Sequence, residues 1–125
     1  MNVVILRGSL TRPPEERALP SGDRVVTFDL RTQPPEGPRE TVSVVSVPPG
    51  TETFDAGDEV VVTGRVRRRF YRTGGATQSR TEVVADAVIA ASDGRRVRRA
   101  VDAALRAVTA SGGREQAAPR RRTVR

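Results

Sequence analysis

Six arginines and the only tyrosine of the chain lie between Val60 and Thr81, in a stretch without acidic residues. This stretch is predicted to form two long strands joined by a glycine-containing loop at 73–79. Side chains alternate between the two faces of a strand, so every second residue shares a side. The solvent-facing side of the first strand is predicted to carry Val61, Thr63, Arg65, Arg67, Arg69 and Tyr71. The other side is expected to be half-buried and to end in Phe70.

Guanidinium groups beside one planar ring suit single-stranded nucleic acid as a ligand. The arginines can contact successive phosphates, and an aromatic face can stack on an unpaired base for about 1–3 kcal/mol. Long hairpins of β proteins also carry arginine simply for solubility and for protection of exposed strand edges. The hairpin by itself does not distinguish these two interpretations, so the rest of the chain must be considered.

The composition excludes most enzyme mechanisms. The 125 residues include no cysteine and no histidine, which removes disulfides, thiolate nucleophiles, histidine acid–base chemistry and the usual zinc sites. The acidic candidates Asp29, Glu40 and Asp86 have no spacing typical of acid–base or metal chemistry. We therefore predict a protein that is not an enzyme and has no cofactor, no metal and no small-molecule substrate.

The net charge of +7 is unevenly distributed along the chain. Residues 1–91 contain 12 arginines and 12 acidic residues, whereas residues 92–125 contain 10 arginines and 3 acidic residues. The first part is therefore neutral in sum, and the acids that balance its basic hairpin lie elsewhere in its sequence. Every basic residue is arginine, which we attribute to a GC-rich genome rather than to bidentate phosphate binding.

Turn signals divide residues 1–91 into five valine-rich pieces. Proline and glycine residues predict a long loop at 11–23 and leave room for at most one helical turn at 48–58. A glycine inside the first piece predicts a bend or a close backbone approach at Gly8. Strands are predicted at 2–10, 24–32, 41–47, 59–72 and 80–90. This pattern indicates a small all-β sandwich or barrel, the five-stranded OB-fold barrel among them.

Residues 92–113 change to the period of a helix. Apolar residues recur at spacings of three and four, at Val97, Val101, Ala104, Leu105 and Val108. Ser92 or Asp93 can cap the start, and Gly112 with Gly113 can end the helix. The apolar face is predicted to pack on the barrel or on a neighbouring subunit, and the arginines are candidates for phosphate contacts. Residues 114–125 form a short basic tail that is predicted to be disordered.

Four blocks of the sequence resemble, in the same order, the bacterial single-stranded DNA-binding protein (SSB) family. "MNVVILRGSLTRPPEER" is similar to the opening strand, glycine and proline-containing loop of the family, and "PSGDRVVTFDLRT" to its second strand. "AGDEVVVTGRVRRRFY" is similar to its fourth-strand block, and "TEVVADAV" to the segment that follows. The blocks span most of residues 1–90, and the chain resembles a short, divergent paralogue of the family.

This resemblance implies an OB fold that forms dimers or tetramers and binds single-stranded DNA without sequence preference. It places Tyr71 at the position of a stacking tryptophan of the family, and Arg67 and Arg69 at basic positions of the same strand. Thr41 and Val47 stand where the family has further stacking rings, so binding is expected to depend more on charge. The acidic C-terminal tip with which the family recruits enzymes is replaced here by a basic tail.

We therefore predict a five-stranded OB-fold barrel at 1–91, an amphipathic basic helix at 92–113 and a basic tail at 114–125. The predicted function is sequence-independent binding and protection of single-stranded DNA in replication, repair or recombination, with RNA left open as a second ligand. The predicted nucleic-acid-binding residues are Arg65, Arg67, Arg69, Tyr71, Arg72, Arg80, Arg31 and Arg7.

The alternative function is that of an assembly or interaction subunit, primosome-like or an oligomeric scaffold. In that case the helix makes the contact and nucleic-acid binding is weak or absent. For either function we expect a homo-oligomer in the cytoplasm, associated with the nucleoid. No apolar run reaches the roughly 18 residues of a membrane span, so no membrane contact is expected.

Overall fold

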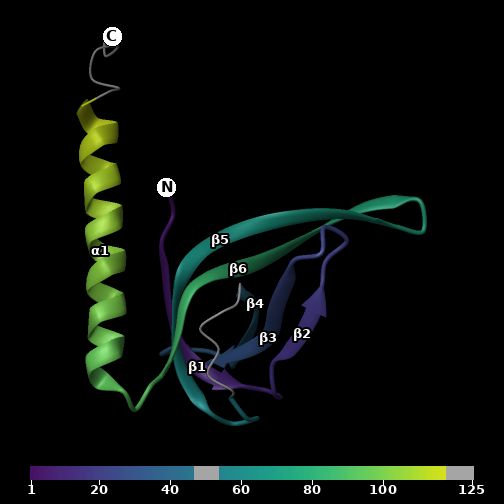
Figure 1. Cartoon of the computed structure of the whole chain (residues 1–125), viewed down its shortest axis with the longest axis horizontal. Helices are drawn as coiled ribbons and strands as arrows, with labels where there is room; N and C mark the ends of the chain where they lie inside the picture. The colour runs from purple at the N-terminus through teal and green to yellow at the C-terminus, as the bar shows by residue number, and fades with distance from the viewer. Residues whose placement is uncertain (47–53, 118–125) are drawn as a thin grey trace.

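The computed structural model describes residues 1–46 and 54–117, with side chains described up to Ala110. Six strands and one helix follow each other along this part of the chain (Figure 1). They are β1 (Val4–Leu10), β2 (Glu15–Ala18), β3 (Arg24–Thr32), β4 (Glu40–Ser46), β5 (Glu59–Thr73), β6 (Ala76–Ala90) and α1 (Gly94–Ala117). Within the described ranges, no helix combines the length and the apolar character that a membrane crossing requires.

Five of the strands close into a barrel of the OB type, as the sequence predicted. The order around the ring is β1-β5-β6-β4-β3, and β3 pairs in turn with β1. One edge of β3 pairs with β4, and the other pairs first with β2 and then with the end of β1 at Leu30 and Arg31. Only the short β4–β6 pairing is parallel among these described pairs. The closing contact needs Gly8, because a Cβ there would collide with the carbonyl oxygen of Arg31.

The barrel interior is filled mainly by aliphatic side chains, since the chain has few aromatic residues. The buried core comprises Leu10, Phe28, Leu30, Val44, Phe54, Val60, Val62, Val83 and Ala85. On β3 the core residues Phe28 and Leu30 alternate with Thr27 and Asp29, which face the other way. This alternation gives the barrel a polar outer face on β3 and β4.

The predicted division of β5 into a wet side and a half-buried side is wrong at both ends of the strand. Val61 and Thr63 are only 5% and 4% exposed, because this part of β5 belongs to the barrel wall and is buried on both faces. Phe70, expected to be half-buried, is 66% exposed. The change occurs at a register shift between Thr63 and Gly64, where a Cβ on Gly64 would collide with the backbone of β6.

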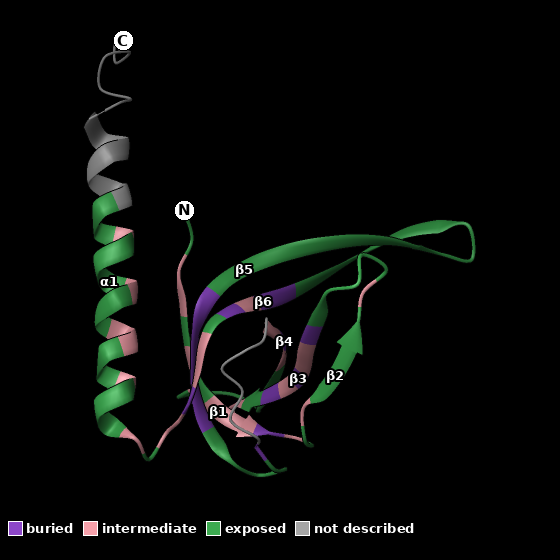
Figure 2. Ribbon diagram, in the orientation of Figure 1, coloured by how far each residue is buried: buried purple, intermediate pink, exposed green. Residues whose placement is uncertain are grey.

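Beyond this bulge, β5 and β6 continue as a two-stranded ribbon that extends away from the barrel (Figure 2). Thr73 pairs directly with Ala76, and both Gly74 and Gly75 have positive φ angles, as a two-residue type I′ turn requires. The seven-residue loop predicted at 73–79 is therefore wrong. The ribbon is longer than the sequence suggested, and its residues are exposed on both faces.

The remaining elements differ from the prediction in two respects and confirm it in a third. β2 lies within the stretch 11–23 that was predicted to be a loop. It was not predicted as a strand because its four exposed residues show no hydrophobic alternation. The amide of Arg96 donates to Asp93 Oδ1 at 3.3 Å, which confirms Asp93 as the helix cap. The helix does not end at Gly112 and Gly113 but continues to Ala117.

Glycine costs only about 1 kcal/mol in a helix, and the first residue that cannot continue one is Pro119. α1 therefore passes through its glycine pair. It contacts β5 and β6 and rises beside the barrel (Figure 1). Val47 and the end of the predicted tail, 118–125, lie outside the described residues.

Candidate nucleic-acid interface

A continuous polar face runs across five strands on the outside of the barrel. In the strand register, Thr27 of β3 lies opposite Glu15 of β2 and Val45 of β4. Asp29 lies opposite Ser43, and further across the sheet Arg67 of β5 lies opposite Glu82 of β6. The polar positions of β3 and the basic positions of β5 therefore belong to one surface.

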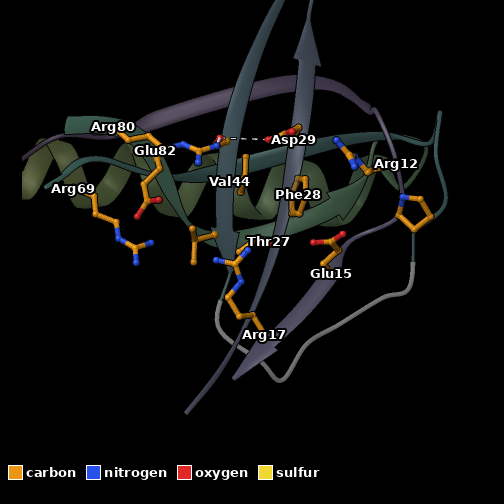
Figure 3. Close-up of a pocket in the computed structure, with 13 residues that line it drawn as sticks. Arg12, Glu15, Arg17, Thr27, Phe28, Asp29, Val44, Arg69, Arg80 and Glu82 are labelled. Atoms are coloured by element: carbon orange, nitrogen blue, oxygen red, sulfur yellow. Dashed lines mark hydrogen bonds between the residues drawn. The ribbon is translucent and has the colours of Figure 1, made fainter. Parts of the chain in front are cut away.

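A groove of about 210 Å³ lies on this face (Figure 3). Arg69, Arg80 and Glu82 approach it from the β5–β6 side, and Arg12 and Glu15 from the opposite side. The full lining consists of Arg12, Pro13, Glu15, Arg17, Thr27, Phe28, Asp29, Ser43, Val44, Val45, Arg69, Arg80 and Glu82. The groove is thus bounded by β2, the base of the ribbon, and the surface of β3 and β4.

Arg67 is held in an ion pair at the base of the ribbon. Its Nε donates to Glu82 Oε2 at 3.0 Å, and its Nη2 donates to the same oxygen. The Glu82 side chain is 4% exposed and that of Arg67 is 42% exposed. A carboxylate this buried needs a compensating charge. Arg67, predicted as a nucleic-acid contact, therefore has a structural partner within the protein.

Arg69 and Arg80 lie directly opposite each other in the register of β5 and β6. Like charges in this position destabilise a sheet, by up to about 1 kcal/mol. Arg80 Nη2 donates to Ser43 Oγ at 2.7 Å, and Ser43 Oγ donates to Asp29 Oδ1 at 3.3 Å. Within the part of the chain that the structure describes, Arg69 has no ion pair. The rim of the groove thus carries a positive charge that an anion would stabilise.

Tyr71 lies on the same side of the ribbon as Arg69, two residues further toward the tip. Its hydroxyl donates to Gln78 Oε1 at 3.2 Å, and 40% of the residue is exposed. Arg65 shares this side, whereas Arg72 and Phe70 occupy the opposite side by the period of two. The ring of Tyr71 therefore lies at the surface of the ribbon, on the same side as the exposed residues Arg65 and Arg69.

Arg31 is exposed and lies on the polar face of β3, two residues beyond Asp29. Arg7 lies elsewhere, beside a second hollow that Glu59 and Ser92 also line. Arg7 donates to both carboxylate oxygens of Glu59 at 3.1 and 3.2 Å. These hydrogen bonds and the paired charges lower the pKa of Glu59 and raise the pKa of Arg7. The structure thus does not bring Arg7 together with the other predicted site residues.

Sequence reasoning missed Arg12 and Arg17, because it assigned both to a loop without a fixed direction. It also missed that Asp29 and Glu82 line the same groove as the arginines. The alternation of Glu15 and Arg17 was the available signal, but four residues are too few to establish a period. Among the described residues, no group of three or more acidic residues could hold a metal ion.

We expect Arg67→Ala to destabilise the fold, because it leaves the buried Glu82 carboxylate without its partner. The expected loss is about 2 kcal/mol, below the usual range for a fully buried pair since Arg67 is partly exposed. Arg65→Ala, two residues away and exposed, should change stability by less than about 0.5 kcal/mol. Urea unfolding measures both. Equal stability of the two variants, or no recovery when Glu82→Gln is added to Arg67→Ala, would contradict this role.

No protein-family model and no curated protein matches the chain. Among solved structures, the chain is similar to SSB of Plasmodium falciparum in complex with single-stranded DNA. The two are 21% identical, with a TM-score of 0.59, and the match covers 72% of this chain and 94% of the other. This likeness supports the OB fold assigned from the strand order. In OB folds, ligands bind on the face of the second and third barrel strands and the adjoining loops, which is where the groove lies.

Proposed function

We propose that the protein binds and protects single-stranded DNA without strong sequence preference, as a non-enzymatic component of replication, repair or recombination. The observation that carries this proposal is the unbalanced charge of the ribbon at the groove. Residues 65–82 contain six arginines and one acidic residue, and that acid is already paired with Arg67. Arg69 and Arg80 face each other at the groove rim despite their repulsion. Phosphates are the anions that such a row of guanidinium groups suits.

Two further features support single-stranded rather than duplex nucleic acid. The groove lies at the OB-fold ligand position, and the similar Plasmodium falciparum structure is a complex with single-stranded DNA. Tyr71 offers one ring on the same side of the ribbon as Arg69, and an unpaired base can stack on it. Thr41 has no ring to add, so we infer an interface that depends mainly on charge.

The affinity for single-stranded DNA is therefore expected to fall steeply with salt. For about five contacted phosphates, the slope of log K against log salt should be near −3.5, using about −0.7 per contact. Arg69→Gln should weaken binding and make the slope less steep by about 0.7. Arg24→Gln is the matched control, because Arg24 is paired with Glu16 and does not line the groove. Titration of a dT oligomer at several salt concentrations measures both, and a salt-independent affinity would refute the proposal.

We expect Tyr71→Ala to weaken binding by about 1–3 kcal/mol through the loss of one stacked base. The fold should be unchanged, since Tyr71 lies on the exposed ribbon. Tyr71→Phe keeps the ring and should retain most of the affinity. Phe70→Ala removes a ring from the opposite side of the ribbon and serves as the control. If Tyr71→Ala binds as well as the wild type, the ring is not part of the interface.

The second candidate function is that of an assembly subunit, and a feature of α1 favours it. The apolar stripe of α1 includes Leu105, which is 51% exposed, although the helix contacts β5 and β6. An exposed leucine on an amphipathic helix suits a contact with another copy of the chain. Self-association and DNA binding are compatible, and we propose a homo-oligomer in which α1 contributes to the contact.

Leu105→Glu should then lower the molar mass of the protein in solution by placing a charge in the helix contact. Ala103→Glu introduces the same charge on the exposed opposite side of the helix and should leave the mass unchanged. Size-exclusion chromatography with light scattering compares the two. Identical masses would exclude α1 as the contact, and unchanged DNA binding by Leu105→Glu would separate assembly from the groove.

A further inference from the structure

The groove carries hydrogen-bond acceptors where a surface for phosphate alone would carry only donors. Asp29, Glu82 and Glu15 line it together with the arginines. A phosphodiester presents only acceptors and is repelled by carboxylates, so these acids do not assist backbone binding. Glu82 is explained by its ion pair with Arg67, whereas Asp29 and Glu15 need a different explanation.

Asp29 and Arg80 are held side by side through one hydroxyl group. Ser43 Oγ accepts from Arg80 at 2.7 Å and donates to Asp29 Oδ1 at 3.3 Å. Within the described residues, the other carboxylate oxygen of Asp29 has no hydrogen bond. Thr27 lies two residues away on the same face and also lines the groove. The floor thus presents an available acceptor next to guanidinium donors, in a fixed arrangement.

A base edge matches this arrangement because it also combines donors and acceptors. Cytosine presents its amino group beside the acceptors N3 and O2, whereas thymine has a carbonyl oxygen in place of the amino group. An aspartate accepts a hydrogen bond from the cytosine amino group, but it repels the carbonyl oxygen of thymine. Bases of single strands are free to be contacted on these edges.

We propose that the groove selects bases that carry an amino group, with Asp29 as the specificity-determining residue, and so favours cytosine over thymine. This inference rests on the proposed binding of single-stranded DNA and adds a preference to it. The ribbon arginines, Arg80 among them, contact phosphates at the rim, while Asp29 reads the base at the floor. Cytosine and thymine have rings of equal size, so a difference in affinity between them reports on their hydrogen-bonding groups rather than on the size of the base.

The test uses the full chain with dC and dT oligomers of about 16 nucleotides, the upper end of the site size of one OB fold. Affinities are measured at neutral pH and two salt concentrations. We expect dC to bind at least about fivefold more tightly than dT, as one discriminating base contact would give. Equal affinities, or a preference for dT, would overturn the inference and leave the proposed function intact. Binding to neither oligomer would overturn the proposed function itself.

Asp29→Asn identifies the residue responsible, because an amide can donate to the thymine carbonyl as well as accept from cytosine. The ratio of dC to dT affinity should fall toward one, while binding of dT becomes tighter through the loss of a negative charge. Asp86→Asn is the matched control, since Asp86 is exposed on β6 and does not line the groove. It should leave the ratio unchanged, and an unchanged ratio in Asp29→Asn would overturn the assignment.

Ser43→Ala provides an independent variant should Asp29→Asn unfold the protein. It removes the hydroxyl that links Arg80 to Asp29 but leaves both charges in place. We expect a reduced dC preference with little change in the salt dependence, because the number of phosphate contacts is the same. An undiminished preference would show that this linked arrangement does not read the base.

Discussion

The structure depends on a single change in β5, the bulge between Thr63 and Gly64. Before it, residues 60–64 are buried on both faces and form part of the barrel wall; after it, β5 and β6 leave the barrel as an exposed ribbon. Gly64 makes the change possible because no Cβ fits against the carbonyl oxygen of Val84. The arginines that follow therefore lie on a ribbon that is exposed on both faces. The bulge thus decides which half of the strand can meet a ligand.

The ribbon is connected to the barrel by an electrostatic contact as well as by backbone hydrogen bonds. The carboxylate of Glu82 is buried at the base of the ribbon, and Arg67 compensates its charge. Arg69 and Arg80, the next opposed pair on the same face of the ribbon, include no acid. Arg67 and Arg69 therefore have different roles although they share one face of β5. The role of each arginine follows from the residue opposite it rather than from its place in a basic run.

Much of the fold was predictable because its strands alternate strongly. β3 was predicted with its observed bounds, since Phe28 and Leu30 alternate with polar residues, and Gly8 was recognised as a close approach. The faces of β5 could not be predicted from a period of two, because the strand is buried on both faces before the bulge and exposed on both faces after it. The groove could not be predicted from the sequence either. Residues from five separate segments form it, and the strand register decides which of them lie together.

The scarcity of aromatic rings limits how the proposed interface could hold a single strand. Stacking on several rings would bind any base, so sequence would matter little. With Tyr71 as the ring on the groove side of the ribbon, arginines would supply most of the attraction in the proposed interface, and this attraction is equally independent of sequence. A carboxylate such as Asp29 weakens that attraction unless it gains a base contact in return. A polar floor is therefore consistent with an interface that exchanges some affinity for discrimination between bases.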